Sequence, residues 1–227
     1  MLSKTYKSNK LFYDAYLYKL QVRTTISNVF KPNYNKEIRR DDLDTYISVS
    51  GTEKQDVNVS KYKVVTHISM MDANHIMNEL LDSTEDFKVR CESYSLIIYT
   101  NNIDLLERIS SGVSADSRCK IWKPPIGSEE VLLDNKRIVI TNKDIEYEYR
   151  LYLKNGSNPS ALVNWIKKNP EKAKIGDSTL NSLANNYYVN GNYFYVKDSK
   201  VLIMVEIIAG KLISKIEKFV HIDDLDK

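Results

Sequence analysis

The segment NYFYVKD, residues 192–198, holds the side chains with the clearest capacity for ligand chemistry in this 227-residue chain. Its composition predicts a β-strand, in which successive side chains point to opposite faces of the sheet. Tyr193, Tyr195 and Lys197 then share one face, and Phe194 points to the other. Aromatic rings on an open sheet face can stack with the bases of a single-stranded nucleic acid, while neighbouring cations attract its phosphates. This pattern favours a binding surface.

A second predicted strand, EYRLYLK, carries a matching set of side chains. Leu151 and Leu153 are expected to point into the core. The residues that alternate with them, Arg150, Tyr152 and Lys154, then point to the open face. We predict that the two strands are neighbours in one sheet, which brings together a candidate nucleic-acid site made of Arg150, Tyr152, Lys154, Tyr193, Tyr195 and Lys197.

The hexamer LYLKNG in the second strand resembles the first-strand signature of RNA-recognition motifs, apolar–aromatic–apolar–x–Asn–apolar. It departs at the last position, where Gly156 stands. The third-strand signature of that family is matched at Tyr193, Tyr195 and Val196, but not at its glycine, small and final aromatic positions. The resemblance covers roughly residues 150–222. It implies that single-stranded RNA or DNA binds on the open sheet face.

A protein contact is the competing interpretation of the same face. Tyrosine is common in strands and at protein–protein interfaces, and this chain contains 16 tyrosines. The net charge is near +7 over residues 1–40, −8 over 41–149 and +6 over 150–220, which suits a polyanion or an attraction between parts of the chain. We therefore expect a non-enzymatic protein that binds single-stranded nucleic acid. The alternative is a structural or assembly subunit of a larger complex, which binds protein partners or self-associates.

Two histidine triplets are the best candidates for catalysis. His67 opens the triplet HIS and His221 opens HID, and the two resemble the paired His-x-Thr/Ser elements of 2H phosphoesterases. In that family the histidines act on one phosphate as general acid and base. Only the first triplet fits, because Asp223 would repel a phosphate. We therefore expect no hydrolase activity from these histidines.

No metal or cofactor site is expected. His67 and His75 are eight residues apart, and no cysteine or carboxylate completes a metal-ligand pattern around them. Cys91 and Cys119 lie on predicted strands and are expected to be buried rather than reactive. No apolar run approaches the roughly 20 residues of a membrane helix. We expect a cytoplasmic protein, or one of the host cytoplasm if the chain is viral, since its Asn, Lys, Ile and Tyr content is typical of AT-rich coding sequences such as those of many phages.

The segments that position these residues recur in one order, β-α-β-β-α-β, in both halves of the chain, which is the split β-α-β pattern of ferredoxin-like folds. In the first half, strands are expected at 16–23, 87–93, 95–100 and 118–123, a further strand at 63–70, and helices at 71–83 and 101–112. In the second half, strands are expected at 148–154, 187–192, 192–198 and 212–222, and helices at 158–170 and 199–210.

The predicted fold is α+β, with two tandem ferredoxin-like units that have antiparallel sheets. Residues 1–124 form the first unit with an inserted polar loop region, residues 125–146 a linker hairpin, and residues 147–227 the second unit, which is similar to an RNA-recognition motif. The segment VLIMVEII is apolar on every side and also fits a strand. Helix caps at Asn102 and Ser199, each followed by a glycine near the end of the segment, favour a helix there.

Overall fold

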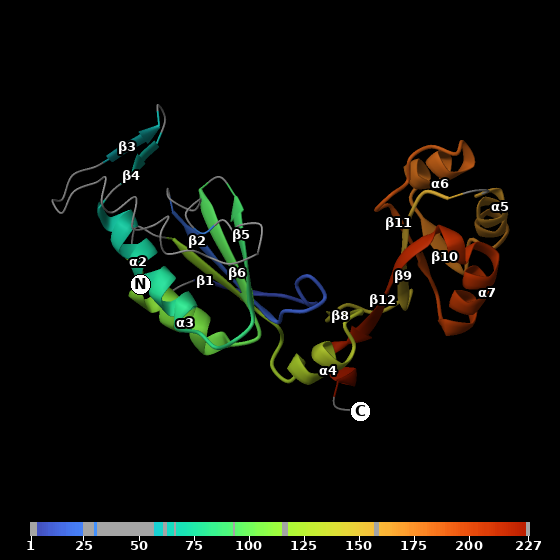
Figure 1. Ribbon diagram of the computed structural model, residues 1–227. Helices are drawn as coiled ribbons and strands as arrows, with labels where there is room; N and C mark the ends of the chain where they lie inside the picture. The colour runs from blue at the N-terminus through green and yellow to red at the C-terminus, as the bar shows by residue number, and fades with distance from the viewer. Residues whose placement is uncertain are drawn as a thin grey trace. The chain divides into compact units, whose positions relative to one another are not determined.

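The computed structural model describes residues 4–24, 30, 57–60, 63–65, 67–92, 94–114, 118–156 and 159–225. The chain divides into two compact units, unit 1 (Met1–Pro125) and unit 2 (Ile126–Lys227). The architecture is α+β, with a five-stranded mixed sheet in each unit and six α-helices among the described residues (Figure 1).

Unit 1 is built on the sheet order β1-β7-β2-β6-β5. β1 and β7 are parallel, and the other neighbours are antiparallel. The strands are β1 (Lys4–Lys7), β2 (Tyr18–Arg23), β5 (Phe87–Glu92), β6 (Ser95–Thr100) and β7 (Cys119–Lys123). Helices α2 (His67–Leu81) and α3 (Ile103–Gly112) pack side by side, and β3 (Val57–Ser60) pairs with β4 (Lys63–Val65).

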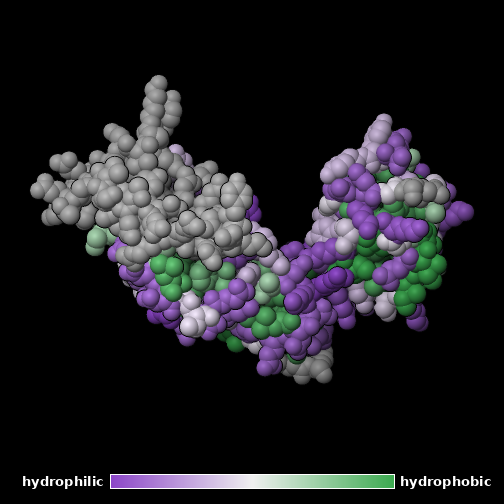
Figure 2. Space-filling view, viewed as in Figure 1, coloured by the Kyte–Doolittle hydropathy of each residue, from purple (hydrophilic) through white to green (hydrophobic). Residues whose placement is uncertain are grey.

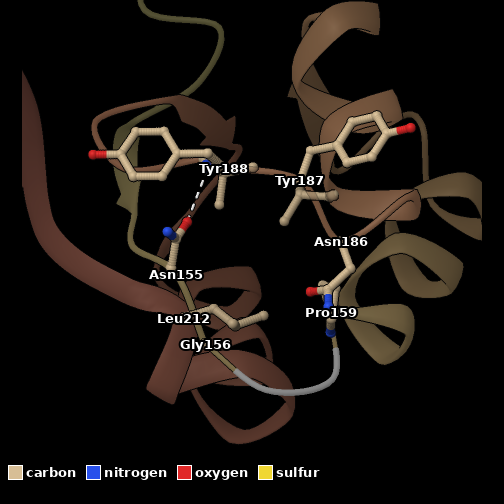
Figure 3. A pocket seen from close by; sticks show the side chains of 9 residues that line it. Asn155, Gly156, Pro159, Asn186, Tyr187, Tyr188 and Leu212 are labelled. Carbon is tan, nitrogen blue, oxygen red and sulfur yellow. Dashed lines mark hydrogen bonds between the residues drawn. The ribbon is translucent and has the colours of Figure 1, made fainter.

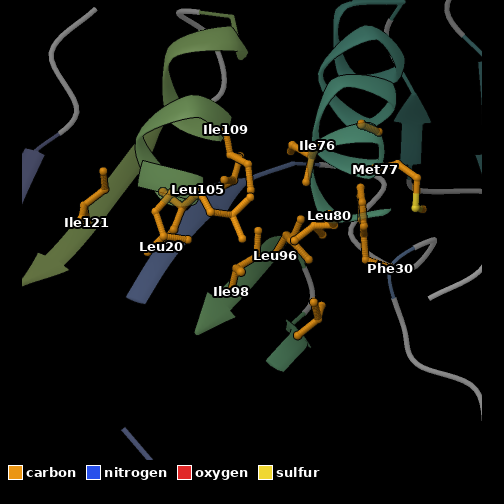
Figure 4. Packing of buried hydrophobic residues seen from close by; sticks show 14 of the residues in the cluster. Leu20, Phe30, Ile76, Met77, Leu80, Leu96, Ile98, Leu105, Ile109 and Ile121 are labelled. Atoms are coloured by element: carbon orange, nitrogen blue, oxygen red, sulfur yellow. The ribbon is translucent and has the colours of Figure 1, made fainter. Parts of the chain in front are cut away.

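The core of unit 1 lies between its two helices and one face of the sheet, as Figure 4 shows. The sheet contributes the alternate residues of its strands, for example Leu20 of β2 and Ile98 of β6, which are fully buried. The helices contribute apolar residues three or four positions apart, such as Ile76 and Leu80 of α2 and Leu105 of α3. The two periodicities meet in one apolar layer, as a helix-on-sheet fold requires.

Unit 2 is built on the sheet order β10-β11-β9-β12-β8. β8 and β12 are parallel, and the other neighbours are antiparallel. The strands are β8 (Ile138–Thr141), β9 (Tyr149–Leu153), β10 (Ala173–Ile175), β11 (Tyr193–Val196) and β12 (Ile213–His221). The helices are α4 (Glu129–Asp134), α5 (Ser160–Lys168), α6 (Asp177–Ala184) and α7 (Ser199–Ala209).

The two units repeat one arrangement of strands. When the strands of each five-stranded sheet are numbered along the chain, both sheets have the order 1-5-2-4-3. In both, the first strand lies at the edge and is parallel to the last. The prediction of purely antiparallel sheets is therefore wrong, because each unit contains an N-terminal edge strand that the predicted six-element pattern did not include.

The linker hairpin predicted over residues 125–146 does not form. The helix α4 occupies its first part, and β8 joins the sheet of unit 2 beside β12. Glu129 and Glu130 lie in the first turn of α4, where the positive end of the helix dipole favours carboxylates. Ile138, Val139 and Ile140 are all buried, so β8 gains more as part of a sheet than as an exposed hairpin.

The strand predicted over residues 187–192 is also absent. Its place in the sheet is taken by the three residues of β10, and α6 follows β10. Asn186 adopts a left-handed φ of 55° and reverses the chain after α6. Tyr187 and Tyr188 are both exposed, so this segment lacks the alternating burial of a strand.

The helix predicted over VLIMVEII is confirmed as α7. Its N-cap is Asp198 and not Ser199, because the Asp198 carboxylate accepts a hydrogen bond of 2.9 Å from the backbone N–H of Val201. The cap predicted at Asn102 is confirmed by the same geometry toward Leu105.

Two further expectations concern the helices. The strand predicted over residues 63–70 is limited to β4, since α2 already begins at His67. Asn158, the cap predicted for the second half, lies outside the described residues, and α5 begins at Ser160.

Candidate nucleic-acid interface

The sheet of unit 2 turns its apolar residues toward the helices, and Tyr152, Tyr193 and Tyr195 to the other face. Leu151 of β9 and Phe194 of β11 are fully buried, in one core with Val163 of α5 and Val205 of α7. The alternate side chains point away from this core. The strand register sets Tyr152 opposite Tyr193, and Arg150 opposite Tyr195. Four of the six predicted site residues are therefore brought together at the centre of the sheet.

The rings on this face form a continuous cluster. Tyr193 lies between Tyr152 and Tyr195, with ring centroids 5.8 and 5.5 Å away, and both contacts are edge-on. Tyr195 also contacts Tyr147 at 6.4 Å and Phe219 of β12 at 6.1 Å. Tyr193 is 43% exposed, which leaves part of its ring available to a ligand.

A buried carboxylate lies at the base of the cluster. Glu217 of β12 is 1% exposed and stands opposite Arg150. It accepts hydrogen bonds from the Arg150 guanidinium, with Nε at 3.0 Å, and from the Tyr152 hydroxyl at 3.1 Å. The Nζ of Lys215 lies 3.3 Å from its other oxygen. These partners supply the pairing that a buried charge requires.

The Arg150 guanidinium therefore makes its ionic and ring contacts within the protein. Its guanidinium carbon lies 5.2, 5.5 and 5.4 Å from the ring centroids of Tyr152, Tyr193 and Phe219. The prediction that Arg150 faces a phosphate as a free cation is therefore revised, because Glu217 already neutralises it. Burial raises the pKa of Tyr152 to about 12, so its hydroxyl remains a proton donor to Glu217 at neutral pH.

The cations that remain exposed lie at the margin of the cluster. Lys154 and Lys197 each follow directly after the last residue of their strand, β9 and β11. Lys174 of β10 stands opposite Tyr195 and is also exposed. These three exposed lysines lie at the ends of the tyrosine strands or directly beside them.

Five further residues contribute to this face and were not predicted: Lys174, Lys215, Glu217, Phe219 and Tyr147. A signal for Glu217 was present, since it is a lone carboxylate in the predicted last strand of the half, ISKIEKFVH. In the predicted topology the first and last strands are neighbours, so a carboxylate there has Arg150 as its natural partner. Lys174 could not be found in this way, because β10 is too short to show alternation.

A hollow of about 290 Å³ lies apart from the predicted residues in unit 2, between Tyr187 and Tyr188 in Figure 3. The Asn155 side chain lines it and accepts a hydrogen bond of 2.9 Å from the backbone N–H of Val189. The described residues that line it carry no carboxyl, amine or imidazole group. The hollow therefore offers no acid–base or metal chemistry.

The candidate catalytic histidines belong to different units, His67 to unit 1 and His221 to unit 2. The Nδ1 of His221 lies 3.4 Å from the Asp223 carboxylate, and the side chain of His67 lies outside the described residues. Cys91 and Cys119 are not joined in a disulfide and are partly buried, and burial raises the pKa of Cys119 to about 11. Among the described residues, no three His, Cys, Asp or Glu side chains are placed to hold a metal ion.

Within the same part of the chain, no helix is both long enough and apolar enough to span a bilayer. No protein-family model, curated protein or solved structure matches the chain.

Proposed function

We propose that this protein is a non-enzymatic binder of single-stranded nucleic acid and that the tyrosine face of unit 2 forms its stacking surface. One observation carries the proposal: partly exposed rings of Tyr193 and Tyr195 adjoin one another on the sheet face away from the helices, with exposed lysines at their margin. Stacking of bases on such rings needs no particular sequence, because every base has a π-face.

The roles within this surface differ between residues. Tyr193 and Tyr195 stack with bases, while Lys154, Lys174 and Lys197 attract phosphates. Arg150, Tyr152 and Glu217 hold the rings in place, because their hydrogen bonds and ring contacts are all internal. We also infer that each unit is ferredoxin-like. Without the extra edge strand, both sheets have the 4-1-3-2 order of a β-α-β-β-α-β unit.

The test is the binding of a labelled single-stranded oligothymidine, followed by fluorescence anisotropy at several salt concentrations. Tyr195→Ala is expected to weaken binding by about 1–3 kcal/mol, the contribution of one stacked base. Tyr188→Ala is the matched control, since Tyr188 is exposed but lies in the loop outside the cluster. Equal affinities of the two variants would refute the proposed surface.

The phosphate contacts are tested by charge. Lys174→Gln is expected to reduce the slope of log K against log salt by about 0.7, the value for one phosphate contact on a single strand. Lys167→Gln provides the control, because Lys167 is exposed on α5, on the opposite side of the sheet. A slope unchanged by Lys174→Gln would exclude this lysine from the site.

One observation favours the assembly alternative. Ile203, Met204, Ile207 and Ile208 are exposed along one side of α7, and Figure 2 shows hydrophobic surface over this helix. An apolar stripe of this kind is self-complementary, so a second copy of the chain is the partner that we propose for it. Sedimentation velocity should show association that depends on concentration and that Ile207→Lys abolishes. A monomer at all concentrations would refute the dimer.

A further inference from the structure

Unit 1 carries a row of side chains that the sequence analysis did not bring together. The parallel register of β1 and β7 sets Tyr6 opposite Trp122. Their rings are stacked, with centroids 5.0 Å apart and planes 20° from parallel. On the other side, Lys19 of β2 stands opposite Trp122, and its Nζ lies 3.8 Å from that ring centroid. The row Tyr6–Trp122–Lys19 therefore crosses three neighbouring strands.

This row lies on the face of the sheet away from α2 and α3. Leu20 and Ile121, the sequence neighbours of Lys19 and Trp122, are buried in the core with the helices. Alternation then directs Lys19 and Trp122 to the other face. Tyr6 ends the row on the edge strand and is 37% exposed, so its ring is accessible to a ligand.

The strand positions on this face are strongly basic. Among them the described strands contribute one carboxylate, Glu92, which forms an ion pair of 2.7 Å with Arg90. Burial lowers the pKa of Lys19; the charge of Glu92 acts in the opposite direction, and the charge of Lys120 lowers the pKa again. A further anion nearby would stabilise the charged form of Lys19. The basic residues placed on this face by strand register are Lys4, Lys19, Arg23, Lys88, Arg90 and Lys120.

The opposite side of the same face is covered by residues 11–17. Phe12 and Tyr13 contact the ring of Tyr99 on β6, with centroids 5.6 and 4.9 Å away, and Tyr99 is buried. The turn is closed by an internal β-bridge from Phe12 and by a left-handed φ of 55° at Tyr13. Tyr13 is also exposed, but its ring contacts Tyr99 and Lys88, so Tyr6 is the exposed ring that adjoins Trp122 itself.

We infer that this row is a second binding site for single-stranded nucleic acid, in which a base stacks on Tyr6 and phosphates lie near Lys19 and Lys120. The Nζ of Lys120 is 5.8 Å from the Tyr6 ring centroid, so one nucleotide can meet both a ring and a cation. Trp122 supports the ring of Tyr6 and reports on it. The inference rests on the proposed function for the class of ligand, but its residues all belong to unit 1.

The two tryptophans of the chain allow a direct test. Trp165 lies on α5 in unit 2, so Trp165→Phe leaves Trp122 as the only tryptophan. Oligothymidine of about a dozen nucleotides is titrated into this variant. Trp122 emission is expected to change on binding, and Tyr6→Ala is expected to shift the midpoint of that change to an oligothymidine concentration about 5- to 150-fold higher.

A charge variant with a matched control completes the design. Lys120→Gln is expected to weaken binding and to lower its salt dependence. Lys7→Gln should leave both unchanged, because Lys7 lies on the same sheet but stands opposite Lys123 on the face toward α3.

The outcomes separate the two sites. Constant Trp122 emission during binding, or an affinity for Tyr6→Ala within twofold of the parent, overturns the inference while leaving the tyrosine face of unit 2 to its own test. Loss of affinity in Tyr6→Ala but not in Tyr195→Ala supports the site in unit 1 and refutes the one in unit 2. Absence of oligothymidine binding at low salt overturns both.

Discussion

Replacement of Glu217 by glutamine tests whether the buried ion pair holds the tyrosine face together. Glu217→Gln keeps the size of the side chain but removes the charge that compensates Arg150. In the variant, the Arg150 side chain is still only 18% exposed, but its guanidinium no longer faces a negative charge at position 217. The perturbation is therefore electrostatic rather than steric.

The expected loss follows from the burial of the two partners. Removal of one partner from a fully buried pair costs about 3–5 kcal/mol. Arg150 retains some access to water and its contacts with three rings, and glutamine can still accept a hydrogen bond from Tyr152. We therefore expect a loss of about 2–4 kcal/mol, a large fraction of the 5–15 kcal/mol that is usual for a domain.

Urea unfolding measures this loss. On a Trp122→Phe background, Trp165 emission follows the unfolding of unit 2 alone. Glu206→Gln is the control, because Glu206 is exposed on α7. The double replacement Arg150→Met with Glu217→Leu should recover most of the loss, since a buried ion pair exchanged for apolar side chains is often neutral. A loss below about 0.5 kcal/mol in Glu217→Gln would refute a stabilising pair.

Three further predictions concern other parts of the two units. Gly112→Ala should destabilise unit 1 by about 1–3 kcal/mol in thermal unfolding, because the added methyl would lie 2.1 Å from the His75 ring; stabilisation by the better helix former would contradict this. Stability should fall as the pH rises from 10 to about 12. Burial raises the pKa of Tyr99 and of Tyr152 to about 12, so in this range the folded form holds protons that the unfolded form releases. An unfolding free energy that does not change with pH, measured by circular dichroism, would contradict this. Cys119 should react slowly with iodoacetamide at pH 8, because a thiol with a pKa of about 11 is ionised in only about one molecule per thousand; labelling at the rate of a free thiol would refute this.

Local patterns in the sequence were sufficient to place the tyrosines. Alternation within each of two predicted strands put Tyr152 and Tyr193 on the open face and Phe194 on the other, and the structure has this arrangement. The helix over VLIMVEII also followed from the capping residue and the glycine predicted at its two ends, although the N-cap is one residue earlier than predicted. These features depend on neighbours in the chain, which a single sequence displays.

Features that depend on distant pairing were not predicted. The strand β1 is four residues long and forms its ladder with β7, more than 100 residues later. Nothing near Tyr6 indicates that Trp122 lies beside it. The commitment of Arg150 to Glu217 has the same origin, since the two residues meet only when β9 and β12 pair.

The parallel edge strands determine how each unit responds to mechanical force. In both units the first strand is paired with the last, β1 with β7 and β8 with β12. A pull on the two ends of a unit draws these parallel strands along each other in opposite directions. The hydrogen bonds of the ladder are then loaded together in shear and not opened one after another as in a hairpin. Each unit therefore resists a force along the chain with all the hydrogen bonds between its first and last strands at once.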